Sequence, residues 1–151
     1  MRRLTISVED ELADAFDELV KQKGYLNRSE AFRDLVRREL EETRIREGSA
    51  KHCVATLSYI YNHHERQLSS RLTAMQHSHH DVTVSSMHAH LDHDQCIETV
   101  ILRGPTSTVM AFAQSVIAQT GVRHGRMNVI PVEIDVRKSS RHFHLHTHPH
   151  T

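Results

Sequence analysis

Two histidines and a cysteine lie close together in the stretch MHAHLDHDQC, which covers residues 87–96. His88 and His90 are two residues apart, so in a β-strand their side chains project from the same face. A turn at residues 92–94 would fold the next strand back and bring Cys96 beside them. Imidazole nitrogen and thiolate sulfur together suit late transition metals, so this stretch predicts a soft-metal site.

Three ligands leave a fourth position on the metal, and several nearby histidines are candidates for it: His77, His79, His80 and His93. Spacing alone allows a tetrahedral zinc site or a square-planar nickel or copper site. Strict alternation along the strand would also place Val82 and Val84 on the histidine face. A β-bulge near Ser85–Ser86 would remove that conflict.

The elements around this stretch predict an α+β domain at residues 52–136. The apolar periodicity indicates strands at 53–61, 82–91, 96–102 and 126–132. It also indicates a helix at 64–80 and a second helix that begins within residues 103–108. The resulting β-α-β-β-α-β order is that of a ferredoxin-like, or ACT-like, domain. Residues 137–151 contain alternating histidines and almost no apolar residues, so we expect a disordered tail that could hold nickel loosely.

The first 46 residues have a different pattern, and residues 46–52 read as a linker. Residues 2–8 alternate like a half-buried strand, and residues 9–23 have helical spacing with Gly24 at the C-cap. Asn27 and Glu30 form a capping box at the start of a second helix. One short strand cannot be stable alone, so two chains are expected to pair their strands antiparallel.

The polar face of this predicted two-stranded ribbon carries Arg3, Thr5 and Ser7, which could read base edges in the major groove of DNA. The segment Asn27, Arg28 and Ser29 places backbone N–H groups and a guanidinium at a helix N-terminus, where phosphate binds well. The strand–helix–helix order with these two motifs resembles the ribbon-helix-helix class of dimeric repressors.

Composition limits the other classes of function. The formal net charge is zero with 15 neutral histidines, and residues 1–51 hold 11 Lys and Arg against 12 Asp and Glu. Bulk charge therefore gives no support to DNA binding, which must depend on local placement. The start of the chain lacks an apolar signal-peptide core and no apolar run is long enough to span a membrane, so we expect a cytoplasmic protein.

Five stretches together resemble the NikR family of nickel-responsive ribbon-helix-helix repressors: RSEAFRDLVR, LSYIYNH, QHSHHD, MHAHLDHDQCIE and GVRHG. The similarity extends over residues 1–132 and implies a homotetramer that represses nickel uptake genes at a palindromic operator on double-stranded DNA. It also implies one square-planar Ni(II) per subunit, held by His88, His90 and Cys96 of one subunit and His77 of a neighbour.

Roles for further residues follow from their position in the chain or, for Glu30 and Asp34, from the resemblance. Glu98 shares a strand face with Cys96 and could orient a ligand imidazole. Glu30 and Asp34 would hold a potassium-like cation between the domains. We also expect His64 and Arg66 to touch the DNA backbone once nickel has ordered their segment. Glu65 stands before Arg66 where some relatives have a second basic residue, so these contacts would be weaker here.

Two other classes of function remain open at this point. A metal-dependent enzyme could use the same histidines and cysteine, although four protein ligands would leave no open position for water or substrate. A ribbon-helix-helix antitoxin would explain the N-terminal residues but leaves residues 53–132 without a role. Neither reading makes use of the whole chain, so a non-enzymatic repressor is the preferred prediction.

Overall fold

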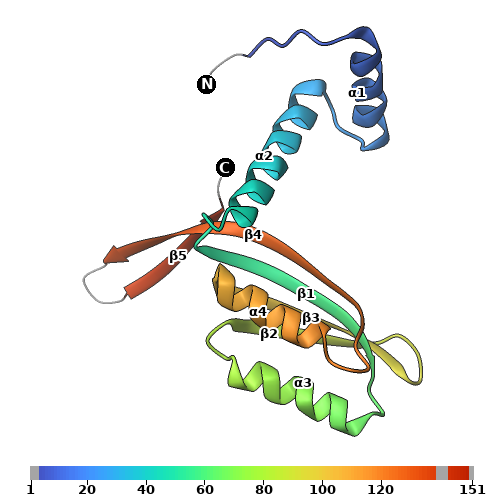
Figure 1. Cartoon of the computed structure of the whole chain (residues 1–151), viewed down its shortest axis with the longest axis vertical. Helices are drawn as coiled ribbons and strands as arrows, with labels where there is room; N and C mark the ends of the chain where they lie inside the picture. The colour runs from blue at the N-terminus through green and yellow to red at the C-terminus, as the bar shows by residue number, and fades with distance from the viewer. Residues whose placement is uncertain (1–3, 139–142, 150–151) are drawn as a thin grey trace. The chain divides into compact units, whose positions relative to one another are not determined.

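The computed structural model describes residues 4–138 and residues 143–149 (Figure 1). The chain divides into two compact units, unit 1 at Met1–Glu42 and unit 2 at Thr43–Thr151. Among the described residues, every helix is too short or too polar to cross a lipid bilayer. The two units differ in how they are built, and each is described by itself.

Unit 1 contains helix α1 (Asp10–Gln22) and most of helix α2 (Arg28–Arg46), close to the bounds predicted from the sequence. Gly24 follows α1 with a φ of +71°, and its N–H donates to a carbonyl in the last turn of the helix. Only glycine takes this left-handed conformation without strain, so the predicted C-cap is confirmed. At the start of α2, the Glu30 N–H donates to Asn27 Oδ1 over 2.9 Å, which confirms Asn27 as the N-cap.

The strand predicted for residues 2–8 is not formed in the described part of this segment. Residues 4–9 have no regular secondary structure, and Leu4, Ile6 and Val8 are 67%, 53% and 49% exposed. A single strand has nothing to pair with inside unit 1, because the only other elements there are helices. The pairing of two such segments into a ribbon therefore stays a prediction about two chains.

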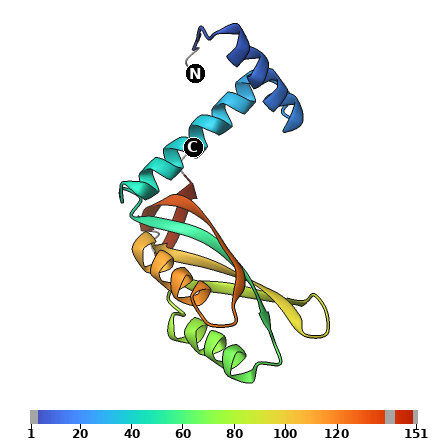
Figure 2. The same ribbon diagram turned by 45° about the vertical axis from the view of Figure 1, so that its right-hand side comes forward.

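Unit 2 is an antiparallel sheet whose strands lie in the order β2-β3-β1-β4-β5 (Figure 1). The strands are β1 (His52–Asn62), β2 (Thr83–His90), β3 (Gln95–Pro105), β4 (Arg123–Lys138) and β5 (Phe143–Pro149). Helices α3 (Arg66–Ser78) and α4 (Thr106–Ile117) cover one face of the sheet, as Figure 2 shows from a second direction. The first four strands and both helices follow the predicted β-α-β-β-α-β order, so the α+β class is confirmed.

The core of unit 2 lies between the sheet and its two helices. Alternate residues of β1 are buried there, and α3 and α4 contribute aliphatic and aromatic side chains. The other face of the sheet is not covered by α3 or α4. Apolar side chains on that face stay partly open, with Met87, Ile101 and Ile130 at 70%, 40% and 39% exposure.

The C-terminal segment differs from the disordered tail predicted for residues 137–151. Strand β4 continues to Lys138, and β5 pairs with it antiparallel from Val132↔Pro149 to Lys138↔Phe143. Period-two alternation of the segment's histidines with other residues is compatible with a strand, and the end of β4 offers a free edge. Residues 139–142, 150 and 151 lie outside the described part of the chain.

Candidate metal centre

The hairpin of β2 and β3 positions the predicted metal ligands. Its register places His88 opposite Glu98 and His90 opposite Cys96, and Tyr61 of β1 lies on the other side of Cys96. Directly opposed residues of antiparallel strands share one face of the sheet. The two histidines and the cysteine therefore share the face that carries the core, at the end of the sheet where the hairpin turns.

A β-bulge in β2 produces this arrangement. The pairing with β3 shifts between Thr83 and Ser85, which leaves Val84 as the extra residue with 52% of its surface exposed. Without the bulge, alternation would have turned the histidines to the face opposite the cysteine. The bulge was predicted from the sequence near Ser85–Ser86, and the structure places it one residue earlier.

Cys96 supplies a fully buried thiol, which donates a hydrogen bond to the Tyr61 carbonyl over 3.6 Å. Burial raises the pKa of the Cys96 thiol. The hydrogen bond with Tyr61 lowers this pKa, and the negative charge of Glu98 raises it. A thiolate at this position therefore needs a positive charge nearby. A bound metal ion provides such a charge and coordinates the sulfur directly.

The imidazoles of His88 and His90 lie above this thiol with their ring centroids 5.0 Å apart and nearly perpendicular planes. The Tyr61 hydroxyl is 3.5 Å from His88 Nδ1. In this single chain the donor atoms of the two histidines and Cys96 do not all lie within 4.8 Å of one another, judged over the described residues. The three side chains share a face of the sheet, but their donor atoms do not converge on one point.

The candidates for a fourth ligand differ in their surroundings. His77 is exposed in the last turn of α3, and no contact joins it to the hairpin histidines in the described chain. His79 packs against the Phe112 ring at 4.8 Å and its Nδ1 lies 2.9 Å from the Met75 carbonyl, so it belongs to the core. His80 lies on the surface with Nδ1 3.3 Å from the His77 carbonyl.

Gln76 connects α3 to the ligand strands, a contact that sequence reasoning missed. Its side-chain amide donates to Glu98 Oε1 over 2.6 Å and to the Tyr59 hydroxyl over 3.2 Å. Glu98 is 8% exposed, so this amide satisfies a nearly buried carboxylate directly across from His88. The residue next to Gln76 is His77, so the end of α3 is fixed to the strand that holds Cys96.

His63 is the second residue that the sequence did not single out. Its ring lies 4.7 Å from that of His90 in an edge-to-face arrangement, and its Nδ1 is buried without a hydrogen-bond partner. Burial lowers the pKa of His63, and the neighbouring charges of His64, His90 and His88 lower it further. An imidazole with a lowered pKa and an unsatisfied nitrogen thus borders the predicted metal ligands.

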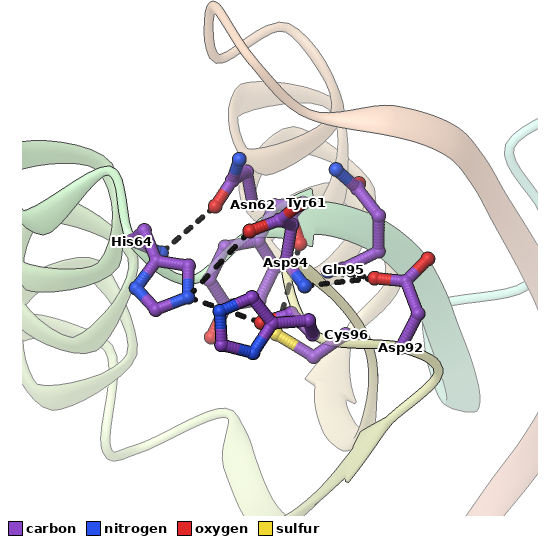
Figure 3. Close-up of polar contacts among 8 residues, drawn as sticks. Tyr61, Asn62, His64, Asp92, Asp94, Gln95 and Cys96 are labelled. Carbon is purple, nitrogen blue, oxygen red and sulfur yellow. Dashed lines mark hydrogen bonds and ion pairs between the residues drawn. The ribbon is translucent and has the colours of Figure 1, made fainter.

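The turn between β2 and β3 is organised by Asp92. Its Oδ1 accepts the backbone N–H groups of Asp94 and Gln95 over 2.8 and 2.7 Å (Figure 3). These two hydrogen bonds lower the pKa of the Asp92 carboxyl. The His63 N–H in turn donates to the Asp94 carbonyl over 3.1 Å, which joins the turn to the end of β1.

His64 points at this turn, whereas the sequence suggested a contact with DNA. Its Nε2 lies 3.0 Å from the His93 carbonyl oxygen and 3.7 Å from Asp94 Oδ1, as Figure 3 shows for Asp94. Donor atoms of His64, His93 and Asp94 all lie within 4.8 Å of one another. These three form the sole such group of metal-binding side chains among the described residues. His93 was one of the four histidines that spacing alone offered as a fourth metal ligand.

The predicted DNA-contact residues of unit 1 are placed as follows. Thr5 and Ser7 are exposed in the segment without secondary structure, and Ser29 is exposed in the first turn of α2. The side chain of Asn27 is engaged as the N-cap. The Arg28 guanidinium is paired with the Asp17 carboxylate of α1. Arg3 and the side chain of Arg66 lie outside the described part of the chain.

The two carboxylates predicted to hold a cation lie on α2, one helical turn apart. Glu30 and Asp34 are both half-buried, and Asp34 Oδ1 accepts a hydrogen bond from Arg37 over 3.4 Å. No third metal-binding side chain joins them within the described residues. Their arrangement within unit 1 neither confirms nor contradicts a cation site.

Residues 54–130 match the family model described as the NikR C-terminal nickel-binding domain, and residues 2–43 match that of ribbon-helix-helix proteins of the copG family. Curated relatives named nickel-responsive regulators occur in Brucella abortus biovar 1 and Brucella suis biovar 1, both 48% identical over 132 residues. A relative of the same name from Brucella melitensis biotype 1 is 47% identical. Each alignment covers 87% of this chain and the whole of the relative.

Proposed function

Because the chain belongs to the NikR family of nickel-responsive regulators, we propose that it is a nickel-dependent transcriptional repressor. In this proposal the protein acts in the cytoplasm on a palindromic operator of nickel uptake genes. It binds that operator when one Ni(II) per subunit occupies a His3Cys site. The observation that carries the proposal is the hairpin register, which sets His90 opposite Cys96 with His88 on the same face.

The proposed donor set suits nickel better than it suits calcium or magnesium. His88, His90 and Cys96 supply two imidazoles and a thiolate, and His77 of the partner subunit supplies the third imidazole. This soft, strong-field set has no carboxylate and favours a planar divalent ion over calcium or magnesium. The exposure of His77 in the single chain supports the proposal that it serves a neighbouring subunit.

A closed set of four protein ligands also favours a regulator over an enzyme. Metal catalysis needs a ligand position for water or substrate, and in this proposal protein side chains would occupy all four ligand positions. The metal would act by holding Cys96 and two subunits together. The chemistry that it supplies is coordination of the thiolate, which the buried sulfur lacks when no cation is near.

DNA recognition is assigned to two copies of unit 1. Leu4, Ile6 and Val8 are exposed in one chain, and pairing with a second chain would bury them while giving each strand its backbone partners. The opposite face of the ribbon would then present Arg3, Thr5 and Ser7 to the major groove. Asn27, Arg28 and Ser29 would lie near phosphates, and Arg28 would exchange Asp17 for a phosphate oxygen.

The homotetramer is assigned to unit 2. The open sheet face carries Ile97, Ile101, Met87 and Ile130, and another copy of this chain would cover it. In this proposal the tetramer also sets His77 of each subunit beside the hairpin ligands of a neighbouring subunit. In the same assembly, Glu30 and Asp34 would hold a potassium ion between the two kinds of domain.

Nickel would control DNA affinity through α3. The amide of Gln76 already links this helix to Glu98 beside the ligands, and coordination of His77 would add a second link at the adjacent residue. A ligand shifts a conformational equilibrium only by favouring one state. The favoured state here is the one in which α3 and the segment with His64 and Arg66 are ordered against DNA.

A gel-shift assay with a palindromic operator, run with and without Ni(II), tests the proposal. We expect nickel to strengthen operator binding strongly and Cys96→Ala to remove both this effect and the sulfur-to-nickel charge-transfer absorption. Cys53→Ala is the matched control, because Cys53 is buried in the same core away from the hairpin and should leave both readouts unchanged. Equal operator affinity with and without nickel in the native protein would overturn the proposed repressor function.

A further inference from the structure

Strands β4 and β5 continue past the end of β1 as a two-stranded segment, called here the C-terminal extension (residues 133–138 and 143–149). The register of β1 against β4 begins at His52↔Val132, so the later residues of β4 pair with β5 alone in the described chain. Figure 1 shows this pair of strands reaching beyond α3 and α4. The family model of the nickel-binding domain ends at residue 130, so the extension lies outside the matched region.

The register of β4 against β5 gives the C-terminal extension two different faces. Directly opposed residues of antiparallel strands share a face, and so do residues two apart on one strand. One face carries apolar residues of both strands: Ile134, Val136, Phe143 and Leu145. The other face carries three opposed pairs: His144↔Arg137, His146↔Asp135 and His148↔Glu133. The backbone register alone places these residues, because the side chains of residues 135–148 lie outside the described part of the chain.

The spacing of the polar pairs is that of ligands to a single metal ion. Successive histidines of β5 are two residues apart, which is about 6.6 Å along a strand. Directly opposed residues have Cβ atoms about 4.5–5.5 Å apart. An imidazole nitrogen or a carboxylate oxygen binds a metal such as zinc at about 2.0–2.2 Å. Two histidines of one strand and a carboxylate of the next strand can therefore share one ion.

Charge selects one end of the histidine row. Arg137 stands opposite His144, and its permanent positive charge opposes a cation at that end. The carboxylates of Asp135 and Glu133 stand opposite His146 and His148, so their charge favours a cation there. Imidazole nitrogen with carboxylate oxygen and no sulfur suits divalent zinc, nickel, copper or cobalt, whereas calcium and magnesium prefer oxygen ligands alone.

An ion at this place would act on the pairing of the two strands. Two strands without further neighbours are marginally stable in water, and the C-terminal extension has only its own two strands beyond Val132 in the described chain. A ligand that binds the paired form and not the separated form stabilises the pairing. An ion with donors on both β4 and β5 meets this condition.

We propose that His146, His148 and Asp135, with Glu133 beside them, form a site for a divalent transition metal that fastens β5 to β4. The juxtaposition that carries the proposal is the register of these two strands. The site is complete within one chain and needs neither the Cys96 ligands nor an operator. It differs from a loose histidine tail, because it needs the carboxylates of β4 at fixed register positions.

Hydrogen–deuterium exchange of the full-length native protein, with and without Zn(II), tests the fastening. Mass spectrometry of peptides that cover residues 143–149 should show backbone exchange slowed several-fold by zinc. Asp135→Asn and His148→Ala should each remove this slowing. His144→Ala is the matched control, because His144 stands opposite Arg137 and its loss should leave the slowing in place. Exchange that zinc does not change in the native protein would overturn the proposal.

Zinc affinity, measured by competition with a chelator in full-length Cys96→Ala protein, tests the ligand set. Asp135→Asn should weaken one zinc-binding event by about tenfold or more, the scale on which metal sites respond to altered surroundings. Asp14→Asn, an exposed residue of α1, is the control for the loss of one negative charge. Equal losses for His144→Ala and His148→Ala, with native affinity in Asp135→Asn, would show a loose histidine tail and overturn the site.

Discussion

The two units of this chain bury their apolar residues by different routes. Unit 2 packs α3 and α4 onto one face of its sheet and buries a continuous core inside a single chain. In unit 1, by contrast, Ala31 is the single buried residue among those described. Large apolar side chains of unit 1 stay 38–55% exposed along its helices: Leu12, Phe32, Val36 and Leu40.

This difference shows what apolar periodicity can and cannot reveal. In both units the pattern identifies the face that must be covered, because an exposed apolar stripe costs free energy wherever it lies. In unit 2 the cover comes from the same chain, whereas in unit 1 the described residues leave these side chains exposed and the proposed dimer would cover them. The predictions below test this contrast, beginning with the largest expected effect.

Leu57→Ala should destabilise unit 2 by about 2–5 kcal/mol, because deletion of a fully buried aliphatic side chain loses its transfer energy and leaves a cavity. Leu57 is 0% exposed in the centre of β1. Urea unfolding followed by circular dichroism measures the change. Leu12→Ala in unit 1 is the counterpart and should leave the unit 2 transition in place; an equal loss for both variants would contradict the contrast.

Ile6→Asp should weaken operator binding by roughly 100-fold, because dimerisation would bury this side chain twice and each burial contributes about 1.5–3 kcal/mol. Nickel absorption should not change, since unit 2 forms its core without unit 1. Gel shifts and absorption spectra measure the two properties. Leu26→Asp is the matched control, because Leu26 is 90% exposed outside the predicted strand. Native operator affinity in Ile6→Asp would argue against a ribbon.

Much of the fold could be predicted from local patterns. The Asn27 cap and the Gly24 helix end follow from backbone chemistry within a few residues, and the structure confirms both. The β-bulge could be inferred because strict alternation would have placed Val82 and Val84 on the same strand face as His88 and His90. Residues 4–9 have no regular secondary structure in the single chain, and the ribbon predicted there needs a second copy, while residues 2–43 match the ribbon-helix-helix family model.

The surroundings of the candidate metal centre were harder to predict. Gln76 and His63 lie far along the chain from Glu98 and His90, and no periodic pattern connects residues across separate elements. His64 was expected to touch the DNA backbone once nickel has ordered its segment, and this stays a prediction; in the single chain the turn that Asp92 closes places it beside Asp94. Sequence spacing identifies donors within one hairpin, whereas contacts between elements depend on the sheet register.

Gln76→Ala should weaken nickel binding by about tenfold, the lower end of the effect of changing a residue that supports metal ligands. The amide donates to Glu98, and its loss leaves a nearly buried carboxylate without that partner beside the ligand strands. Competition with a nickel chelator measures the affinity. Gln67→Ala lies on the same helix at an exposed position and is the control. Equal nickel affinities for both variants would show that Gln76 does not couple α3 to the metal ligands.

Asp17→Asn should have the smallest effect, because its ion pair with Arg28 is exposed and screened by solvent. The hydrogen bond from Arg28 holds the pKa of Asp17 below its ordinary 3.8. The pair therefore stabilises unit 1 fully above that pH, and the stabilisation disappears as the pH falls through the lowered value. Thermal unfolding of native and variant protein should differ slightly at neutral pH and converge in acid.

High salt should reduce the same difference, since exposed charges are screened within about 10 Å at 0.1 M. Glu18→Gln, an exposed neighbour on α1, is the control for a general loss of charge. A difference between native protein and Asp17→Asn that persists unchanged in acid would exclude the ion pair as its cause. Unit 1 would then depend on contacts with a second chain even for the packing of α1 beside α2, which would make its contrast with unit 2 complete.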